Sequence, residues 1–207
     1  EIGAPLVTTP EGTTNCKFWG LGADGTVGAN KNSIKIIGDN TDMYAQAYFD
    51  YDSKKSGGVT MSHLRFGHSP IKSTYLIHKA NFVACHNPAY VRKYNMVQEL
   101  VDGGTFLLNC SWDMEGLEKH LPGQVKKFIA DHNINFYTID GVKIGIETGM
   151  GPTRINTILQ SAFFELTGII PADKANQLMK DAAQKTYGRK GEDVVKKNWA
   201  AIDAGAK

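Results

Sequence analysis

The pattern of apolar and polar positions predicts strands and helices that alternate along the chain. Short runs rich in apolar, β-branched and aromatic residues favour strands, and they fall at residues 16–19, 44–51, 59–66, 82–86, 105–110 and 134–139. Helical spacing predicts helices at residues 26–37, 88–100, 117–120, 124–132, 152–167, 172–187 and 192–204. Such alternation is typical of an α/β sandwich. Because residues 44–51 and 59–66 form a hairpin, the predicted fold is a three-layer α/β/α sandwich with a mixed sheet.

The ends of the predicted elements divide the chain into a linker and one domain. Residues 1–15 are rich in Thr, Pro and Gly without an apolar period, which predicts a linker, with the domain at residues 16–207. Gly38 and Gly168 are expected to end helices, because glycine is common just after a helix. Pro88 and Pro152 are expected to begin helices, because proline suits a first turn.

A glycine-rich turn lies between the first predicted strand and the first predicted helix. It reads Gly20-Leu21-Gly22-Ala23-Asp24-Gly25, and Thr26 follows it. In a Gly-x-Gly-x-x-Gly turn the glycines permit a tight turn, let a ligand approach the backbone and bring the helix close to the sheet. A helix N-terminus presents N–H groups to a phosphate. We therefore expect free backbone amides here, and a hydroxyl from Thr26.

The residues of this turn leave three interpretations open. A nicotinamide cofactor favours an acidic residue about 20 positions further on, at the end of the second strand. Asp42 precedes that strand, whereas Asp50 and Asp52 come late and near two lysines. The second interpretation is a turn that serves packing alone, and the third is a different phosphate-bearing ligand.

The loop of the predicted hairpin is a second candidate for anion binding. Ser56-Gly57-Gly58 offers backbone N–H groups that form an anion nest in some turns. Lys54 and Lys55 add positive charge, and His63 and Arg65 alternate onto one strand face. The alternative is a solvated hairpin tip. Together with the glycine turn, the loop suggests two phosphate-binding patches in one fold.

Composition and charge exclude several classes of protein. The chain has 207 residues, 42% of them hydrophobic, and a net charge of +2, which argues against nucleic-acid binding driven by bulk charge. There is no apolar run of membrane-spanning length and no signal peptide. Because the chain begins with Glu1, it is expected to be processed or a fragment.

The cysteines and histidines indicate neither a metal site nor a catalytic centre. Cys16, Cys85 and Cys110 have no close spacing, which predicts buried, reduced thiols, a cytoplasmic location and no zinc or iron–sulfur site in this chain. Six histidines form no HxxxH or HExxH motif, and there is no GxSxG motif. The segment from Glu147 to Arg154 is predicted to join two helices. We therefore expect neither catalytic residues nor metal ligands.

Several long strings, in order, resemble the gamma-type domain of pyruvate:ferredoxin oxidoreductase. They read FWGLGADGTVGANKNSIKIIGD, AQAYFDYDSKKSGGVTMSHLRFG, PIKSTYLI, FVACH and GMGPTRINTILQSAFFEL. The resemblance covers residues 17 to 204. It implies an oxidoreductase of anaerobic metabolism, also called pyruvate synthase. This enzyme decarboxylates pyruvate, passes the acetyl unit to coenzyme A and passes electrons to ferredoxin.

The resemblance also implies which residues bind a ligand. The gamma-type domain is associated with coenzyme A binding and with covering the active site. By this resemblance the ADP part of coenzyme A faces Leu21, Gly22, Ala23, Asp24, Gly25 and Thr26. Ser56 and Gly57, with Lys55 or Arg65 near, hold another phosphate. The 3′-phosphate of coenzyme A suits positive charge better than a carboxylate.

The chain lacks features of a complete enzyme of this family. Thiamine diphosphate and [4Fe–4S] clusters are expected only in other domains or subunits, because no cluster motif or thiamine-binding segment occurs here. We expect an excised domain, inactive alone, whose partners are the other parts of the same oxidoreductase and, through them, ferredoxin. No nucleic acid or membrane partner is expected. The alternatives are an NAD-binding dehydrogenase-like domain and a non-binding docking scaffold.

Overall fold

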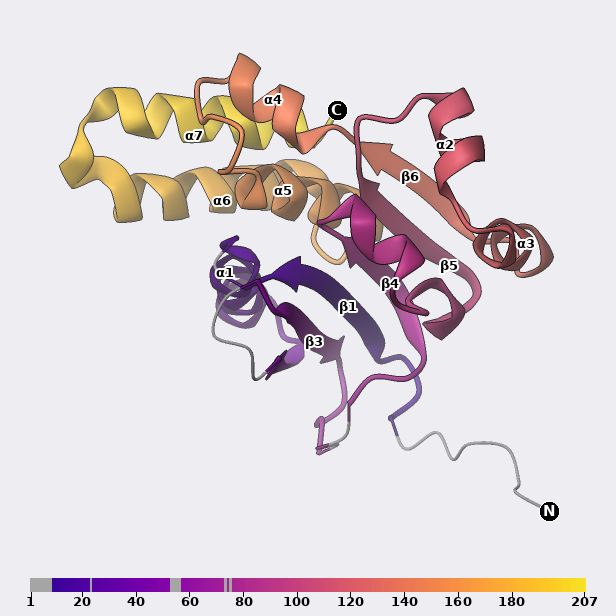
Figure 1. The fold of residues 1–207 in the computed structure, drawn as a ribbon. Coiled ribbons are helices and arrows are strands. Elements are labelled where there is room, and N and C mark those ends of the chain that lie inside the picture. Colours follow the sequence, from indigo (N-terminus) through magenta and orange to yellow (C-terminus); the bar gives the residue numbers. More distant parts are fainter. Residues whose placement is uncertain (1–8, 23, 53–56, 73, 75) are drawn as a thin grey trace.

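A mixed sheet of six strands forms the middle of the molecule (Figure 1). The computed structural model describes residues 9–22, 24–52, 57–72, 74 and 76–207. The strands are β1 (Thr14–Leu21), β2 (Tyr44–Tyr51), β3 (Val59–Gly67), β4 (Ala80–Cys85), β5 (Leu100–Asn109) and β6 (Asn135–Ile139). Their order across the sheet is β2-β3-β1-β4-β5-β6. Strand β3 runs antiparallel to its neighbours β1 and β2, and the other pairs are parallel, so the predicted mixed sheet is confirmed.

Helices cover both faces of the sheet, which confirms the three-layer α/β/α prediction. The helices are α1 (Thr26–Asn40), α2 (Met114–His120), α3 (Gly123–Asp131), α4 (Gly141–Glu147), α5 (Asn156–Thr167), α6 (Ala172–Tyr187) and α7 (Glu192–Gly205). Three short 3₁₀ helices are η1 (Pro88–Arg92), η2 (Val97–Glu99) and η3 (Gly188–Lys190). Helices α1, α5, α6 and α7 contribute to the core on one face, and η1, η2 and α3 to the core on the other.

Alternation along the strands sends successive side chains into these two cores. In β1, Phe18 packs in the first core with Phe163 of α5, whereas Trp19 packs in the second. Phe163 has no exposed surface and contacts the rings of Phe18 and Phe82. Burying a side chain of this size stabilises the fold by about 2–3 kcal/mol. The period of two seen in the sequence therefore fixes which layer each strand residue joins.

One buried ion pair lies on the second face. Lys17 of β1 is 4% exposed, and its Nζ lies 2.7 Å from Oε1 of Glu99 at the end of η2. The Lys17 ammonium also lies 4.9 Å from the ring centre of Trp19. Burial raises the pKa of the Glu99 carboxyl, and the bond from Lys17 opposes that rise. The pair matters to folding because either charge alone would be poorly solvated there.

Several predicted element boundaries are wrong. Helix α1 continues past Gly38 to Asn40, because Gly38 keeps a helical conformation and Thr41 caps the helix end through its N–H and hydroxyl, both bonded to Ile37 O. Helix α5 begins at Asn156 rather than Pro152. The helix predicted over residues 88–100 is replaced by η1 and η2, whose buried residues are held by the second core. By contrast, Gly168 ends α5 with a φ of 59°, as predicted.

The predicted linker overlaps the first strand. Strand β1 already includes Thr14 and Asn15, and the backbone N–H of Asn15 donates to Oδ1 of Asn81 at 2.8 Å. Residues 1–8 of that linker lie outside the described residues. The ordered sheet therefore starts two residues before the predicted domain boundary.

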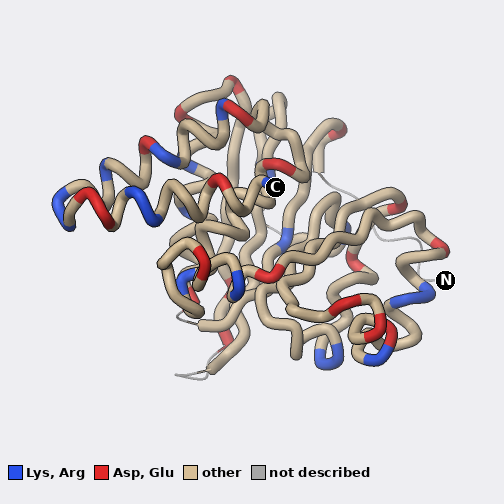
Figure 2. The backbone as a smooth tube through the Cα atoms, turned by 90° about the horizontal axis from the view of Figure 1, so that it is seen from above, with Lys and Arg blue, Asp and Glu red and all other residues tan. Residues whose placement is uncertain are grey.

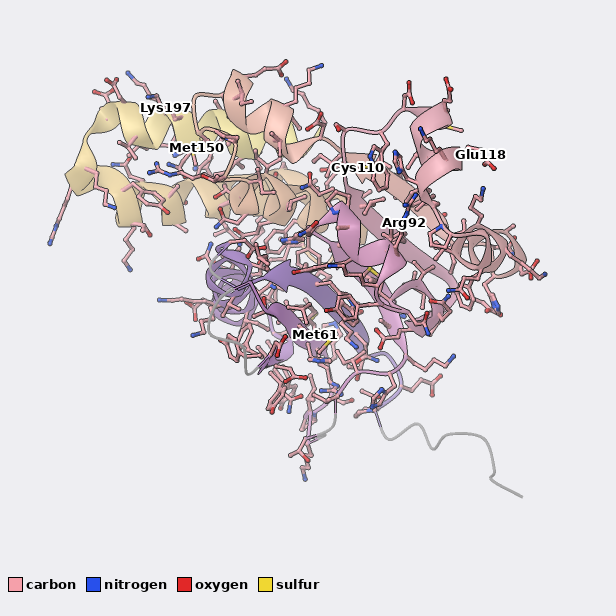
Figure 3. The ribbon with its side chains drawn as sticks, in the orientation of Figure 1. Met61, Arg92, Cys110, Glu118, Met150 and Lys197 are labelled. Atoms are coloured by element: carbon pink, nitrogen blue, oxygen red, sulfur yellow. The ribbon has the colours of Figure 1, made fainter. Side chains whose placement is uncertain are left out.

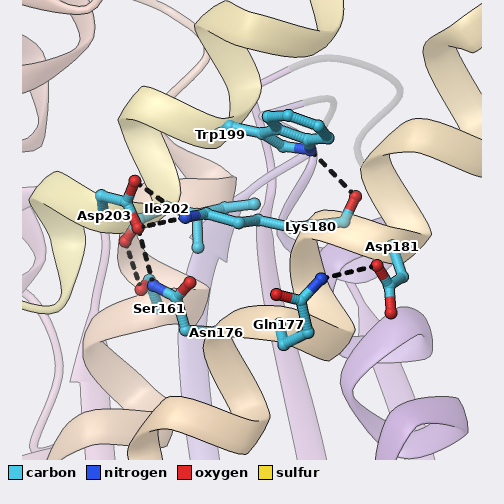
Figure 4. Close-up of polar contacts among 8 residues, drawn as sticks. All are labelled: Ser161, Asn176, Gln177, Lys180, Asp181, Trp199, Ile202 and Asp203. Atoms are coloured by element: carbon cyan, nitrogen blue, oxygen red, sulfur yellow. Dashed lines mark hydrogen bonds and ion pairs between the residues drawn. The ribbon is translucent and has the colours of Figure 1, made fainter.

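Helices α6 and α7 form an antiparallel hairpin held by polar contacts (Figure 4). Asp203 of α7 pairs with Lys180 of α6 at 2.6 Å and accepts a hydrogen bond from Asn176 Nδ2 at 3.0 Å. Trp199 Nε1 donates to the backbone oxygen of Lys180 at 3.0 Å. The segment between α4 and α5, which includes Met150, lies against α7 (Figure 3), where a Cβ on Gly149 would lie 3.2 Å from Cε of Lys197.

Charges of both signs are interspersed along the chain (Figure 2). Cys16, Cys85 and Cys110 are free thiols with buried side chains, as predicted. Within the described part of the chain, no helix combines the length and apolar character needed to cross a bilayer.

Candidate functional site

The candidate site lies at the edge of the sheet where the parallel strands end. Strand β1 continues into α1, and its neighbour β4 ends beside it at Cys85. In open α/β sheets, ligands bind in the crevice outside the carboxyl ends of the strands, where the strand order reverses. The glycine turn and the loop of the β2–β3 hairpin both reach this edge, because Leu21 at the end of β1 pairs with Val59 at the start of β3.

The glycine turn and the tip of the β2–β3 hairpin are in direct contact. The backbone N–H of Gly22 donates to the backbone oxygen of Gly58 at 2.8 Å. A Cβ on Gly22 would lie 3.3 Å from that oxygen, so the close approach favours glycine. Gly57, beside it, is exposed and has a φ of 71°, a left-handed conformation. The structure therefore brings the two candidate anion sites together.

The expectation that the amides of the turn are free is wrong for those of Leu21, Gly22, Asp24 and Thr26. The Asp24 carboxylate accepts hydrogen bonds from the N–H of Leu21 and the N–H of Thr26, each at 2.8 Å. The Asp24 N–H itself donates to the Leu21 oxygen at 3.0 Å. A carboxylate of the chain thus occupies the position at which a bound phosphate was predicted. At the helix start, Asp24 satisfies the N–H of Thr26, one of the groups that a helix otherwise leaves unpaired.

The Thr26 side chain is buried and is hydrogen-bonded within the protein. It is 1% exposed, and its Oγ1 lies 2.8 Å from Nδ1 of His86, which follows β4. Burial lowers the pKa of His86 to about 4, although the nearby Asp24 carboxylate opposes this effect, so the ring is neutral at pH 7. A Cβ on Gly20 would lie only 2.5 Å from the Thr26 hydroxyl oxygen. Gly20 therefore allows α1 to start this close to the sheet.

The third glycine of the turn contacts a helix rather than the sheet. Gly25 is exposed, with a φ of 88°, and a Cβ there would lie 2.9 Å from Asn156 Nδ2 of α5. Asn156 Nδ2 donates to the Gly25 oxygen at 3.4 Å. Gly25 and Gly57 are the exposed members of the predicted set. Leu21, Gly22 and Asp24 are half-buried, and Ala23, Lys55 and Ser56 lie outside the described residues.

Arg65 is separated from the other predicted site residues. It pairs with Asn15 near the opposite edge of the sheet, six residues along β3 from Val59. At about 3.3 Å per residue this distance is roughly 20 Å. Its side chain is buried, and its Nη1 donates to Gln46 Oε1 at 3.0 Å. The prediction that Arg65 lies near the hairpin tip is therefore wrong.

The sequence analysis missed two polar residues that follow the parallel strands. Asn109 ends β5, where its Nδ2 donates to the His86 oxygen at 2.9 Å and its Oδ1 accepts from the Gly141 N–H at 2.9 Å. His86 in turn donates its N–H to the Trp19 oxygen at 2.9 Å. These bonds tie the ends of β1, β4 and β5 to the start of α4. Their sequence signal is a polar residue directly after a buried strand.

A cavity of 510 Å³ opens at the same edge of the sheet under α4. Its lining includes Cys110, Asp140, Val142 and Ile146. Burial raises the pKa of the Cys110 thiol (labelled in Figure 3), so it is not an activated nucleophile. Within the described residues, no group of three or more His, Cys, Asp or Glu side chains is arranged to hold a metal ion.

The sheet topology disfavours the nicotinamide interpretation. A dinucleotide-binding unit places the acidic residue at the end of the strand beside the glycine turn. Here β2 is separated from β1 by β3, so its end lies two strands, about 10 Å, away from the turn. Asp24 also occupies amides that a pyrophosphate would need.

Comparison with known protein families identifies the family of this chain. The model of the pyruvate ferredoxin/flavodoxin oxidoreductase family matches residues 15–207. The chain belongs to this family. Pyruvate:ferredoxin oxidoreductase from Moorella thermoacetica is 57% identical over 203 residues, which cover 98% of this chain and 17% of that protein. The chain therefore spans about a sixth of the length of this relative.

Solved structures of oxidoreductase subunits share the fold. Subunit PORC of pyruvate oxidoreductase from Thermotoga maritima is 17% identical with a TM-score of 0.74, covering 95% of this chain and 96% of that one. A 2-oxoglutarate:ferredoxin oxidoreductase from Magnetococcus marinus, solved with coenzyme A bound, is 15% identical with a TM-score of 0.67. The match covers 95% of this chain and 31% of that one. The fold of this chain is thus that of a whole subunit in the Thermotoga maritima structure and of about a third of a longer chain in the Magnetococcus marinus structure.

Proposed function

We propose that this chain is the gamma-type domain of a pyruvate:ferredoxin oxidoreductase, where it binds coenzyme A and covers the active site. The complete enzyme would convert pyruvate, coenzyme A and oxidised ferredoxin to acetyl-CoA, carbon dioxide and reduced ferredoxin. Thiamine diphosphate and [4Fe–4S] clusters would belong to its other domains. The chain alone would be inactive. Three buried free thiols agree with a reducing, cytoplasmic location.

One observation carries this proposal: 57% identity to a pyruvate:ferredoxin oxidoreductase extends over 98% of the chain. The alternative of a nicotinamide-binding domain conflicts with the position of β2 and with the occupied turn.

The geometry supports coenzyme A at the edge where the glycine turn meets the hairpin tip. Gly25 and Gly57 expose backbone there without side chains, so a ligand is able to approach closely. Because the Asp24 carboxylate already faces the start of α1, it offsets part of the positive potential of the helix N-terminus. Positive side chains must then supply most of the attraction for phosphates. We propose Lys55, with Ser56 beside it, for this role.

The proposed covering role is supported by apolar side chains on neighbouring elements. Met114 of α2 is 80% exposed, and Val142 and Ile146 of α4 are 40% and 59% exposed. These two helices follow β5 and β6 at the carboxyl edge. Exposed apolar groups of this kind are typical of surfaces that pack against another protein or domain.

Steady-state kinetics of a full-length oxidoreductase test the proposal. This chain would replace the matching segment of the Moorella thermoacetica enzyme, and the Michaelis constants for coenzyme A and pyruvate would be measured separately. Lys55→Glu should raise the KM for coenzyme A about tenfold, the scale of one charge-assisted hydrogen bond, and leave the KM for pyruvate unchanged.

Lys35→Glu provides a matched control, because Lys35 is exposed on α1 ten residues, about 15 Å, beyond Gly25. It should leave both constants unchanged. Equal KM values for coenzyme A in the two variants would reject this binding edge. A chimera that makes no acetyl-CoA although it is folded would reject the proposed function, and a domain used only for docking predicts no change in either variant.

A further inference from the structure

Helix α4 presents apolar side chains to solvent and glycines to the rest of the protein. Val142 and Ile146, which are four residues apart and share one helical face, are 40% and 59% exposed. The buried residues of α4 are Gly141 and Gly145. A surface helix normally turns its apolar face toward the core. The orientation of α4 is therefore the reverse of the usual one.

Close packing fixes this orientation. A Cβ on Gly145 would lie 2.5 Å from the backbone oxygen of Gly151, and a Cβ on Gly141 would lie 3.0 Å from Oδ1 of Asn109. The Gly151 N–H also donates to the Gly145 oxygen at 2.9 Å. Because no side chain fits between α4 and these neighbours, the helix cannot turn its two exposed apolar residues inward. The glycine-rich segment that joins α4 to α5 thus holds the apolar face outward.

The outward face of α4 forms one wall of the 510 Å³ cavity at the carboxyl edge. Val142, Ile146 and Pro88 contribute apolar surface, and Cys110 (Figure 3) also belongs to the lining. Among the described residues that line this cavity, no buried side-chain nitrogen or oxygen lacks a hydrogen-bond partner. The cavity therefore favours an apolar group over a ligand that needs hydrogen bonds.

Charged side chains accompany this apolar surface. Asp140, Lys143 and Glu147 also line the cavity, and two carboxylates with one ammonium give a formal charge of −1. Lys143 Nζ lies 4.0 Å from Glu147 Oε1, and the Lys143 N–H donates to Asp140 Oδ1 at 2.9 Å. An apolar centre with a polar rim is the usual anatomy of a protein–protein interface. The negative balance favours a partner that carries Lys or Arg beside its apolar side chain.

The size of the relatives indicates where such a partner lies. This chain spans about a sixth of the length of the Moorella thermoacetica enzyme, so most of an enzyme of that length lies outside it. Permanent interfaces are more hydrophobic than transient ones, which agrees with the exposed apolar pair of α4. Aromatic residues and Met are enriched at the centres of interfaces, where they fill pockets.

We infer that another domain of the same oxidoreductase inserts an aromatic or Met side chain into the cavity beside α4. Val142 and Ile146 pack against the inserted side chain, and a neighbouring Lys or Arg of that domain faces Glu147. The inference rests on the proposed function and deepens it, because it names the residues through which the proposed covering domain is held to the rest of the enzyme.

Thiol labelling at position 146 tests the inference. The native cysteines are buried, so the thiol introduced by Ile146→Cys should react readily with a maleimide in the isolated chain. In the full-length chimera with the Moorella thermoacetica enzyme it should react at least tenfold more slowly, as measured by mass spectrometry of the labelled peptide. Unfolding the chimera in urea should restore the fast rate. Equal rates in the folded chimera and the isolated chain would overturn the inference.

Two substitutions in the Ile146→Cys chimera test whether a side chain is inserted. Ser111 is an exposed lining residue, so Ser111→Trp fills the cavity with an indole and should raise the labelling rate at least threefold. Val142→Asn should have the same effect. Leu76→Asn is the matched control, because Leu76 is 37% exposed and lies outside the lining. An unchanged rate with Ser111→Trp, or an equal increase with Leu76→Asn, would count against the inference.

Assembly and activity separate the inference from its alternatives. The isolated chain is expected to be a monomer; a dimer that Ile146→Asn dissociates would assign the α4 face to a second copy and overturn the inference. A chimera that makes acetyl-CoA while the introduced thiol reacts at the rate of the isolated chain would refute the inference and leave the proposed function standing. A folded chimera that protects the thiol but makes no acetyl-CoA would do the reverse.

Discussion

Replacing Asp24 by alanine tests whether the chain itself fills the glycine turn. The substitution removes the carboxylate that accepts from the N–H groups of Leu21 and Thr26, both at 2.8 Å. Loss of each of these two hydrogen bonds costs about 1 kcal/mol. We therefore expect the free energy of unfolding to fall by about 2 kcal/mol. For a domain of this size the melting temperature should fall by about 4–8 °C.

Urea unfolding followed by circular dichroism measures this change, with Asp39→Ala as the control. Asp39 is exposed near the end of the same helix, where a carboxylate is not favoured, so its removal should change stability by less than about 0.5 kcal/mol. Added pyrophosphate should stabilise Asp24→Ala more than the wild-type chain, because the variant has two further unpaired amides. Equal stability of the two variants, or equal stabilisation of wild type by pyrophosphate, would refute the reasoning.

Two further predictions concern buried ionisable groups. Burial lowers the pKa of His63 to about 3 and of His86 to about 4, so below pH 6.5 the unfolded chain binds protons that the folded chain does not. The free energy of unfolding, measured with urea, should fall by about 2 kcal/mol between pH 6 and pH 5. The variant His63→Gln should show about half of this fall. A free energy of unfolding that does not change with pH over this range would contradict the prediction. Glu99→Gln leaves the buried Lys17 charge unpaired and should cost about 2–3 kcal/mol in thermal unfolding. The matched Glu118→Gln, in an exposed pair, should cost under about 0.5 kcal/mol, and equal losses would contradict the difference in burial.

The layers of the fold were predictable because apolar residues recur at every second position in a strand and every three to four positions in a helix. Strand positions such as Phe18 and Trp19 alternate between two cores, and the helix after residue 155 repeats its apolar residues at helical spacing. Boundaries were harder, because caps and cores decide them. Thr41, rather than Gly38, supplies the bonds that end α1.

The candidate site was only partly predictable from the sequence. A side chain of the protein competes with a ligand for the backbone amides, and the direction of a strand decides which end of the sheet a residue reaches. A glycine motif shows where a backbone is able to turn, but it does not show whether a nearby carboxylate takes its amides. Asp24 was the signal, because an aspartate often accepts a hydrogen bond from the backbone N–H two residues further on, here that of Thr26. Arg65 was placed wrongly because the direction of β3 carries it to the far edge of the sheet. His86 and Asn109 become neighbours only through strand pairing, which one sequence does not reveal.

A crystal structure of this chain soaked with coenzyme A tests the central claim most directly. The account predicts phosphate density beside the exposed backbone of Gly25 and Gly57, with the Asp24 carboxylate still bonded to Leu21 and Thr26. Coenzyme A bound instead at the opposite edge of the sheet would contradict it; that edge has a separate cavity, also of 510 Å³, whose lining includes Asn81 and His132.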